Sequence, residues 1–201
     1  MPVVPGREYR AMSLLLPTAA NKRIDTDFYV EGYATTFNQP YVLFEEEGVQ
    51  YKEVIDRNAL VGADMSDVIM QYDHRGNVLA RQSNGTLIIV PDLTGLFVAA
   101  DLSKSVAARN LHEEISNQLI TKMSWAFTVA EESYDRVTHT RRILRIKKVY
   151  DVSAVSLPAN PSTDISARSW LDGVIEAERQ ERLAAEAAVR RAKKIRILLE
   201  V

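Results

Sequence analysis

Three residues of the 201-residue chain carry side chains that together could break an acyl bond: His74, Ser124 and Asp151. A serine hydroxyl is a poor nucleophile until a neighbouring imidazole accepts its proton, and the imidazole needs an acidic partner to fix its tautomer. These residue types supply all three roles. Their order along the chain does not identify a triad, because unrelated proteases build the same geometry in different orders. They therefore stand as a hypothesis for acyl transfer.

Apolar and polar residues alternate over residues 119–129, and this pattern predicts a strand that contains Ser124. Trp125 and Phe127 lie on one face of this strand, and Ser124 and Ala126 lie on the other. Because the same-face neighbour that follows Ser124 is small, we expect a substrate to reach the hydroxyl.

Asp151 and Ser153 share one face of a second predicted strand, residues 143–157, which is rich in Val and Ile. A carboxylate in so apolar a strand needs a partner, since burying it alone is costly. His74 follows a strand predicted at residues 67–72 and lies at a turn, where a rigid element can present it to a cleft. The pattern thus places all three side chains on or next to strands.

The remaining pattern predicts a mainly β fold with helices, of the α+β class. A loop is expected at the glutamate-rich residues 45–48, a short helix at 56–60, and a longer helix from Ser103 with an apolar stripe. The other predicted strands are residues 9–16, 28–37, 51–55, 78–81, 86–90 and 96–102.

The chain changes character near its C-terminal end, where Ala, Glu, Arg and Lys dominate. This composition predicts a long charged helix, and such a charge run is most often a solvated helix face. We therefore divide the chain into an opening segment, residues 1–27, a β domain, residues 28–162, and a helical tail, residues 163–201.

Composition excludes several kinds of function. The net charge of -2 argues against nucleic acid as a partner, and the absence of cysteine excludes disulfides and Cys-ligated zinc. The chain has no motif of a zinc helix, a phosphate-binding loop or a dinucleotide fingerprint, so no metal or cofactor is expected. No apolar run approaches the length of a membrane span. We expect a soluble intracellular protein with no membrane partner.

Several motifs resemble the HK97-type prohead serine proteases of tailed bacteriophages. The resemblance runs in matching order through about residues 28–162, and its most specific part is the closing Val-Ser-x-Val-x-x-Pro-Ala-Asn-Pro. It is carried by residues 32–37 (GYATTF), 51–55 (YKEVI), His74, 123–127 (MSWAF) and 150–161 (YDVSAVSLPANP).

This resemblance implies a β-barrel flanked by helices, similar to the herpesvirus maturation proteases. It implies a serine endopeptidase that cleaves the scaffolding segment of the major capsid protein, and then itself, inside the immature capsid in the host cell cytoplasm. The family nucleophile falls on Ser124 and its histidine on His74. The third position, usually glutamate, is Asp151 here, one methylene shorter. The tail is implied to be a targeting segment that self-cleavage removes.

Several alternatives stay open at this point. His139 or His112 could complete the triad instead of Asp151, as a second histidine does in herpesvirus enzymes. By the same analogy Arg141 and Arg142 are candidates for the oxyanion hole, although an exposed hairpin pair is the simpler interpretation. The same barrel could also be a non-catalytic capsid assembly scaffold or chaperone, and homo-oligomerisation is undecided. An unrelated esterase is less favoured, because the chain has no Gly-x-Ser-x-Gly elbow.

Overall fold

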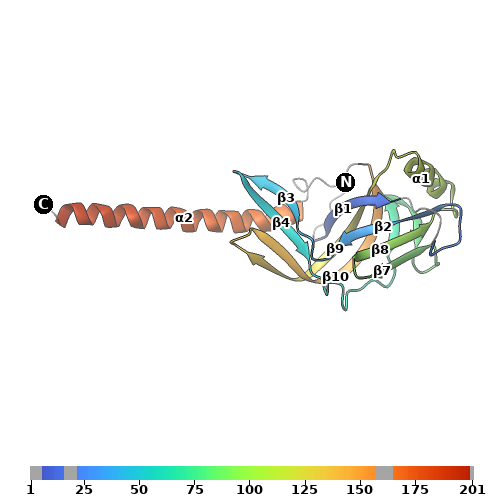
Figure 1. Ribbon diagram of the computed structural model, residues 1–201, viewed down its shortest axis with the longest axis horizontal. Coiled ribbons are helices and arrows are strands. Elements are labelled where there is room, and N and C mark those ends of the chain that lie inside the picture. Colours follow the sequence, from blue (N-terminus) through green and yellow to red (C-terminus); the bar gives the residue numbers. More distant parts are fainter. Residues whose placement is uncertain (1–5, 16–21, 157–164, 200–201) are drawn as a thin grey trace. The chain divides into compact units, whose positions relative to one another are not determined.

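The computed structural model describes residues 6–15, 22–156 and 165–199 (Figure 1). In these ranges the chain forms ten strands and two helices, and it divides into two compact units, Met1–Asp164 and Ile165–Val201. The first unit holds the strands and helix α1 (Val106–Ser116), and the second holds helix α2 (Ile165–Leu199). The fold is mainly β with helices, which confirms the predicted class.

The strands form one sheet around a hairpin of its two longest members, β9 (Lys122–Asp135) and β10 (Thr140–Val155). The path through the sheet runs β3, β4, β10, β9, β1, β2, β8, β7, and β5 pairs with both β10 and β6. The other strands are β1 (Glu8–Leu15), β2 (Tyr29–Thr36), β3 (Tyr41–Glu46), β4 (Val49–Ile55), β5 (Ile69–Tyr72), β6 (Arg75–Arg81), β7 (Leu87–Pro91) and β8 (Gly95–Asp101).

The predicted β-barrel is wrong, because this sheet stays open. β4 pairs with the first residues of β10, and β1 pairs with the first residues of β9. In an antiparallel hairpin the first residues of the two strands lie at opposite ends. The two branches that end in β3 and β7 therefore leave the hairpin at opposite ends, and within the described strands β3 and β7 do not pair.

The core lies under one face of β9, whose inward side chains are fully buried: Met123, Trp125 and Phe127. Helix α1 packs onto the same core through one stripe, Ala108, Leu111 and Ile115. The helix begins after Ser105, whose Oγ accepts a hydrogen bond from the backbone N–H of Ala108 at 3.1 Å. The face of β9 that the alternation predicted to be apolar is therefore the face that packs into the core.

Two local predictions are wrong. The glutamate-rich segment is the end of β3 followed by a turn, because Glu47 and Gly48 both take positive φ angles and join β3 to β4 as a hairpin. The helix expected at residues 56–60 is a series of turns. There the Asp56 carboxylate accepts a hydrogen bond from the Asn58 N–H at 2.9 Å, which favours a turn over a helix.

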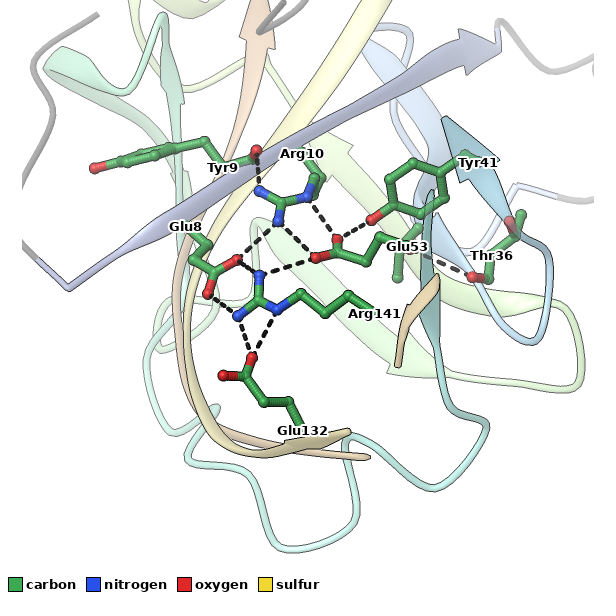
Figure 2. A network of polar contacts seen from close by, with 9 residues as sticks. Glu8, Tyr9, Arg10, Thr36, Tyr41, Glu53, Glu132 and Arg141 are labelled. Carbon is green, nitrogen blue, oxygen red and sulfur yellow. Dashed lines mark hydrogen bonds and ion pairs between the residues drawn. The ribbon is translucent and has the colours of Figure 1, made fainter. Parts of the chain in front are cut away.

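A group of five charged side chains, four of them buried, joins β1 to β4, β9 and β10 (Figure 2). We call it the ion cluster, and its members are Glu8, Arg10, Glu53, Glu132 and Arg141. Arg10 contacts both carboxylate oxygens of Glu53, at 2.6 and 2.7 Å. Arg141 contacts both oxygens of Glu8, at 2.7 and 2.8 Å. Each pair is a two-point contact, the geometry in which arginine binds carboxylate best.

Glu8 stays charged in the ion cluster although it is buried. Burial by itself raises the pKa of Glu8, but hydrogen bonds from Arg141 and the charges of Arg10 and Arg141 outweigh it, so the pKa of Glu8 is lowered. Glu53 is fully buried and also accepts a hydrogen bond from the Tyr41 hydroxyl. Removing one member would leave its partners charged and buried, which costs more than a surface ion pair contributes.

The first prediction concerns Glu53. The substitution Glu53→Ala should lower the free energy of unfolding by about 3 to 5 kcal/mol, because it leaves two buried guanidinium groups short of an acceptor. Urea denaturation followed by fluorescence would measure the change. The matched control is Glu131→Ala, which removes an exposed ion pair to Arg145 (2.6 Å) and should leave the stability almost unchanged. Equal effects of the two substitutions would contradict the role of the ion cluster.

The second prediction concerns pH. Since the folded pKa of Glu8 lies below its ordinary value of 4.5, its charge contributes stability above that pH, and the contribution is lost as the pH falls through the folded pKa. The variant Glu8→Gln should therefore be less stable than the wild type at pH 7, and the two should converge below pH 4.5. Urea midpoints over a pH series would test this, and a difference that is constant with pH would refute it.

Candidate active site

Ser124 lies near the start of β9, in the middle of the sheet. Its register partners are Ser153 on β10 and Ala11 on β1, both antiparallel. Ser124 is fully buried. The expectation that a substrate could reach the hydroxyl directly is therefore wrong for this conformation.

Asp151 and Ser153 reach the Ser124 face through an irregularity in β10. The pairing with β9 shifts by one residue between Val149 and Asp151, so that Ser153 lies opposite Ser124. Residues directly opposite in an antiparallel pair project to the same face of the sheet. Without the shift, Val152 would occupy that position. The bulge thus selects the polar face of β10 to meet the serine.

His74 lies in the tight turn between β5 and β6. Asp73 and His74 both have positive φ angles, 49° and 57°, a region that costs a non-glycine residue about 1 to 2 kcal/mol. Hydrogen bonds from the end of β10 hold this turn in place. The Asp73 carboxylate accepts from the backbone N–H and the hydroxyl of Ser156 at 3.0 and 2.9 Å, and the Asp73 N–H donates to the carbonyl of Ala154 at 3.0 Å.

The structure brings His74, Ser124 and Asp151 into direct contact. His74 Nε2 lies 2.8 Å from Ser124 Oγ, and His74 Nδ1 lies 2.5 Å from Asp151 Oδ1. The His74 side chain is only 1% exposed. Because a carboxylate can only accept, Nδ1 donates to Asp151 and the neutral ring leaves Nε2 free to accept the serine proton. This arrangement can turn the hydroxyl into a nucleophile.

Two further side chains fix these groups, and the sequence did not assign them a role. The buried hydroxyl of Ser153 donates to Asp151 Oδ1 at 2.9 Å. The ring of Tyr9 packs edge-on against the His74 ring, with centroids 4.7 Å apart. The shared face of Asp151 and Ser153 was visible as an alternation of two residues, whereas nothing in the sequence connects Tyr9 with residue 74.

The other two histidines lie elsewhere. His112 packs against the ring of Phe28 at 5.3 Å between centroids, and burial, with a smaller contribution from the charge of Lys22, lowers its pKa. His139 lies in the turn between β9 and β10, where its Nδ1 is 3.1 Å from the hydroxyl of Tyr134. The geometry therefore brings Asp151, and not a second histidine, to His74.

The two arginines considered for the oxyanion hole lie at the hairpin end of β10, away from Ser124. Arg141 pairs in register with Tyr134, near the end of β9, and is 2% exposed within the ion cluster. The simpler interpretation, an exposed hairpin pair, is wrong for Arg141. Arg142 is partly exposed and contacts Asp56 at 3.0 Å.

Two kinds of feature are absent from the described residues. No group of three or more His, Asp or Glu side chains is placed to hold a metal ion there. In the same part of the chain, no helix is long and apolar enough to cross a bilayer.

Comparison with known protein families gives one result. Residues 16–177 match the model of a family described as caudovirus prohead serine protease. The match includes all three candidate residues and confirms the family that the motifs indicated, whereas β1 lies outside it. Searches of curated proteins and of solved structures found no match.

The third prediction concerns the tautomer of His74. Because Asp151 accepts from Nδ1, the neutral ring should carry its proton on Nδ1, the less common form in free histidine. Nitrogen-15 NMR of the imidazole groups would measure this, with the partly exposed His112 and His139 as internal references. In Asp151→Asn the preference should weaken, since an amide can also donate. A proton on Nε2 in the wild type would contradict the described contact.

Proposed function

Since this chain belongs to the caudovirus prohead serine proteases, we propose that it is the maturation endopeptidase of a prohead, with Ser124 as nucleophile. The family is one of serine proteases, so the chain is a hydrolase that acts on peptide bonds. In the proposed mechanism His74 is the general base, and Asp151 orients the imidazole and stabilises its cation.

The observation that supports this assignment is the continuous chain of contacts from Ser124 Oγ through His74 to Asp151. His74 Nε2 takes the hydroxyl proton as Oγ attacks the scissile carbonyl, and later gives it to the leaving amine. Water then enters, and the same base activates it to hydrolyse the acyl-enzyme. Asp151 remains ionised throughout and compensates the charge of the imidazolium.

The shorter acid does not require a bridging water. Aspartate stands where the family usually has glutamate, and a direct contact demands that His74 lie closer to β10. The 2.5 Å separation of Nδ1 and Oδ1 meets that demand. Hydrogen bonds from the Asp73 turn to Ala154 and Ser156 hold the histidine against this strand.

The substrates we propose follow from the family. A prohead protease implies a capsid protein as substrate and the immature capsid in the host cell as its place of action. We infer that it cleaves the scaffolding segment of the major capsid protein and then its own chain. On this proposal residues 28–162 carry the reacting groups, β1 completes the sheet around them, and the charged tail from residue 163 is removed.

A second candidate function, a non-catalytic assembly scaffold, is favoured by the burial of the site. Ser124 is fully buried and His74 almost so, and a covered hydroxyl cannot meet a peptide bond. Cleavage requires neighbouring groups to move, whereas a scaffold requires no such movement. What separates the two functions is dependence on Ser124.

The fourth prediction tests the proposed roles. The full chain is expressed together with the major capsid protein of its own virus, and cleavage is followed by intact mass. Ser124→Ala and His74→Ala should abolish cleavage, and Asp151→Asn should slow it by about 10⁴-fold, the effect of the corresponding change in a serine protease triad. Thermal melting of each variant controls for folding.

The same masses separate the alternatives. Shortening of the protease near residue 162 in the wild type, and not in Ser124→Ala, would support self-removal of the tail. Capsid protein that is processed equally well by Ser124→Ala would overturn the catalytic assignment. Capsid protein that stays whole with the wild type while the two proteins associate would favour the scaffold.

A further inference from the structure

A cavity of about 480 Å³ opens between β6 and helix α1, next to the turn that carries His74. Its volume lies within the range of small binding pockets. Buried Leu79 and Leu111 and half-buried Ala107 supply an apolar floor. The floor could accept an aliphatic side chain and exclude water from it.

Four polar side chains surround this floor. They are Arg75, Asn77, Asn110 and Glu114. Within the described part of the chain, no hydrogen bond or ion pair is formed by any of these four side chains, so their polar groups face the open cavity. Amide and charged groups of this kind match the N–H and C=O groups of an extended peptide.

The backbone of β6 could also bind an extended peptide. Among the strands described, β6 pairs only with β5, and its residues 75–78 are exposed. An edge strand with unpaired N–H and C=O groups is a template for an added strand. Peptide that lies along β6 would place alternate side chains toward the cavity.

Both walls of the cavity lead to the proposed reacting groups. β6 starts at Arg75, the residue after His74, and α1 is followed by β9, where Ser124 is the third residue. Tyr72 and Arg75 line the cavity and flank the turn that carries His74, so a segment held against these walls lies beside that turn. We propose that this cavity is a substrate subsite that binds an aliphatic side chain of the extended capsid-protein segment beside the scissile bond.

This proposal rests on the proposed function and is tested in the same co-expression assay. Ala107→Phe fills the floor and should slow cleavage of the capsid protein about tenfold or more, the discrimination that an apolar pocket achieves. Asn110→Phe should also fill the cavity and slow cleavage. Because Asn110 is exposed on α1, this variant keeps the test valid if Ala107→Phe does not fold. The matched control is Val106→Phe, which alters an adjacent residue that is 65% exposed and outside the cavity.

A second set of variants identifies the occupant. Each aliphatic residue that flanks the cleavage site of the capsid protein is replaced by Gly, and cleavage is measured with wild-type protease and with Ala107→Phe. At the position that the cavity binds, Gly should slow the wild type about tenfold and should not slow Ala107→Phe further, because that contact is already lost.

The outcomes separate the subsite from the function. Wild-type cleavage that Ala107→Phe and Asn110→Phe leave unchanged would overturn the subsite and leave the catalytic assignment intact. The subsite would also be overturned if, at every flanking position, the Gly substitution slowed Ala107→Phe by the same factor as it slowed the wild type. Cleavage that persists in Ser124→Ala, or no cleavage by the wild type, would instead overturn the proposed function.

Discussion

The pairing of β9 with β10 is the constraint on which the rest of the structure depends. A shift of one residue between Val149 and Asp151 decides which side chains of β10 share a face with Ser124. A strand has a period of two, so a shift of one exchanges its entire polar and apolar sets. With the shift, Asp151 and Ser153 meet the serine, and the opposite face of β9 stays free for the core. Chemistry and stability therefore depend on the same irregular pair.

Strand β1 connects this pair to β2, and the side chains on its two faces have different partners. Glu8 and Arg10 lie on one face and enter the ion cluster (Figure 2). Tyr9 lies between them in the sequence, and its ring contacts His74 from the other face. The cluster is costly to dehydrate, so its value lies less in net stability than in the register that it enforces. If β1 slipped by one residue, two charges would move to the histidine side. The ion cluster thus fixes the position of the Tyr9 ring.

The sequence predicted much of the sheet because alternation and β-branched residues are local signals. It predicted the apolar face of β9, the helix after Ser103 and the residue types of the site. It missed β3, where glutamates on an edge strand resemble a loop. The barrel that the family resemblance implied is also not formed, because closure depends on where each strand joins β9 and β10. The sequence indicated Asp151 as a partner for His74 but could not place Asp151 on the face of Ser124, since a bulge leaves no mark in the spacing of Asp151 and Ser153.

Burial of Ser124 restricts how a substrate could reach it. The β9–β10 pair supplies two of the three contacting groups and also anchors Trp125 and Phe127 in the core, so separating these strands would cost far more than a substrate could repay. The turn that carries His74 is different: it has two residues at positive φ and is tied to β10 through Asp73 by a few hydrogen bonds. It also adjoins the cavity between β6 and α1. Movement of this turn would break a few hydrogen bonds, whereas movement of β9 would break the core contacts of Trp125 and Phe127 as well as the contacts of Ser124.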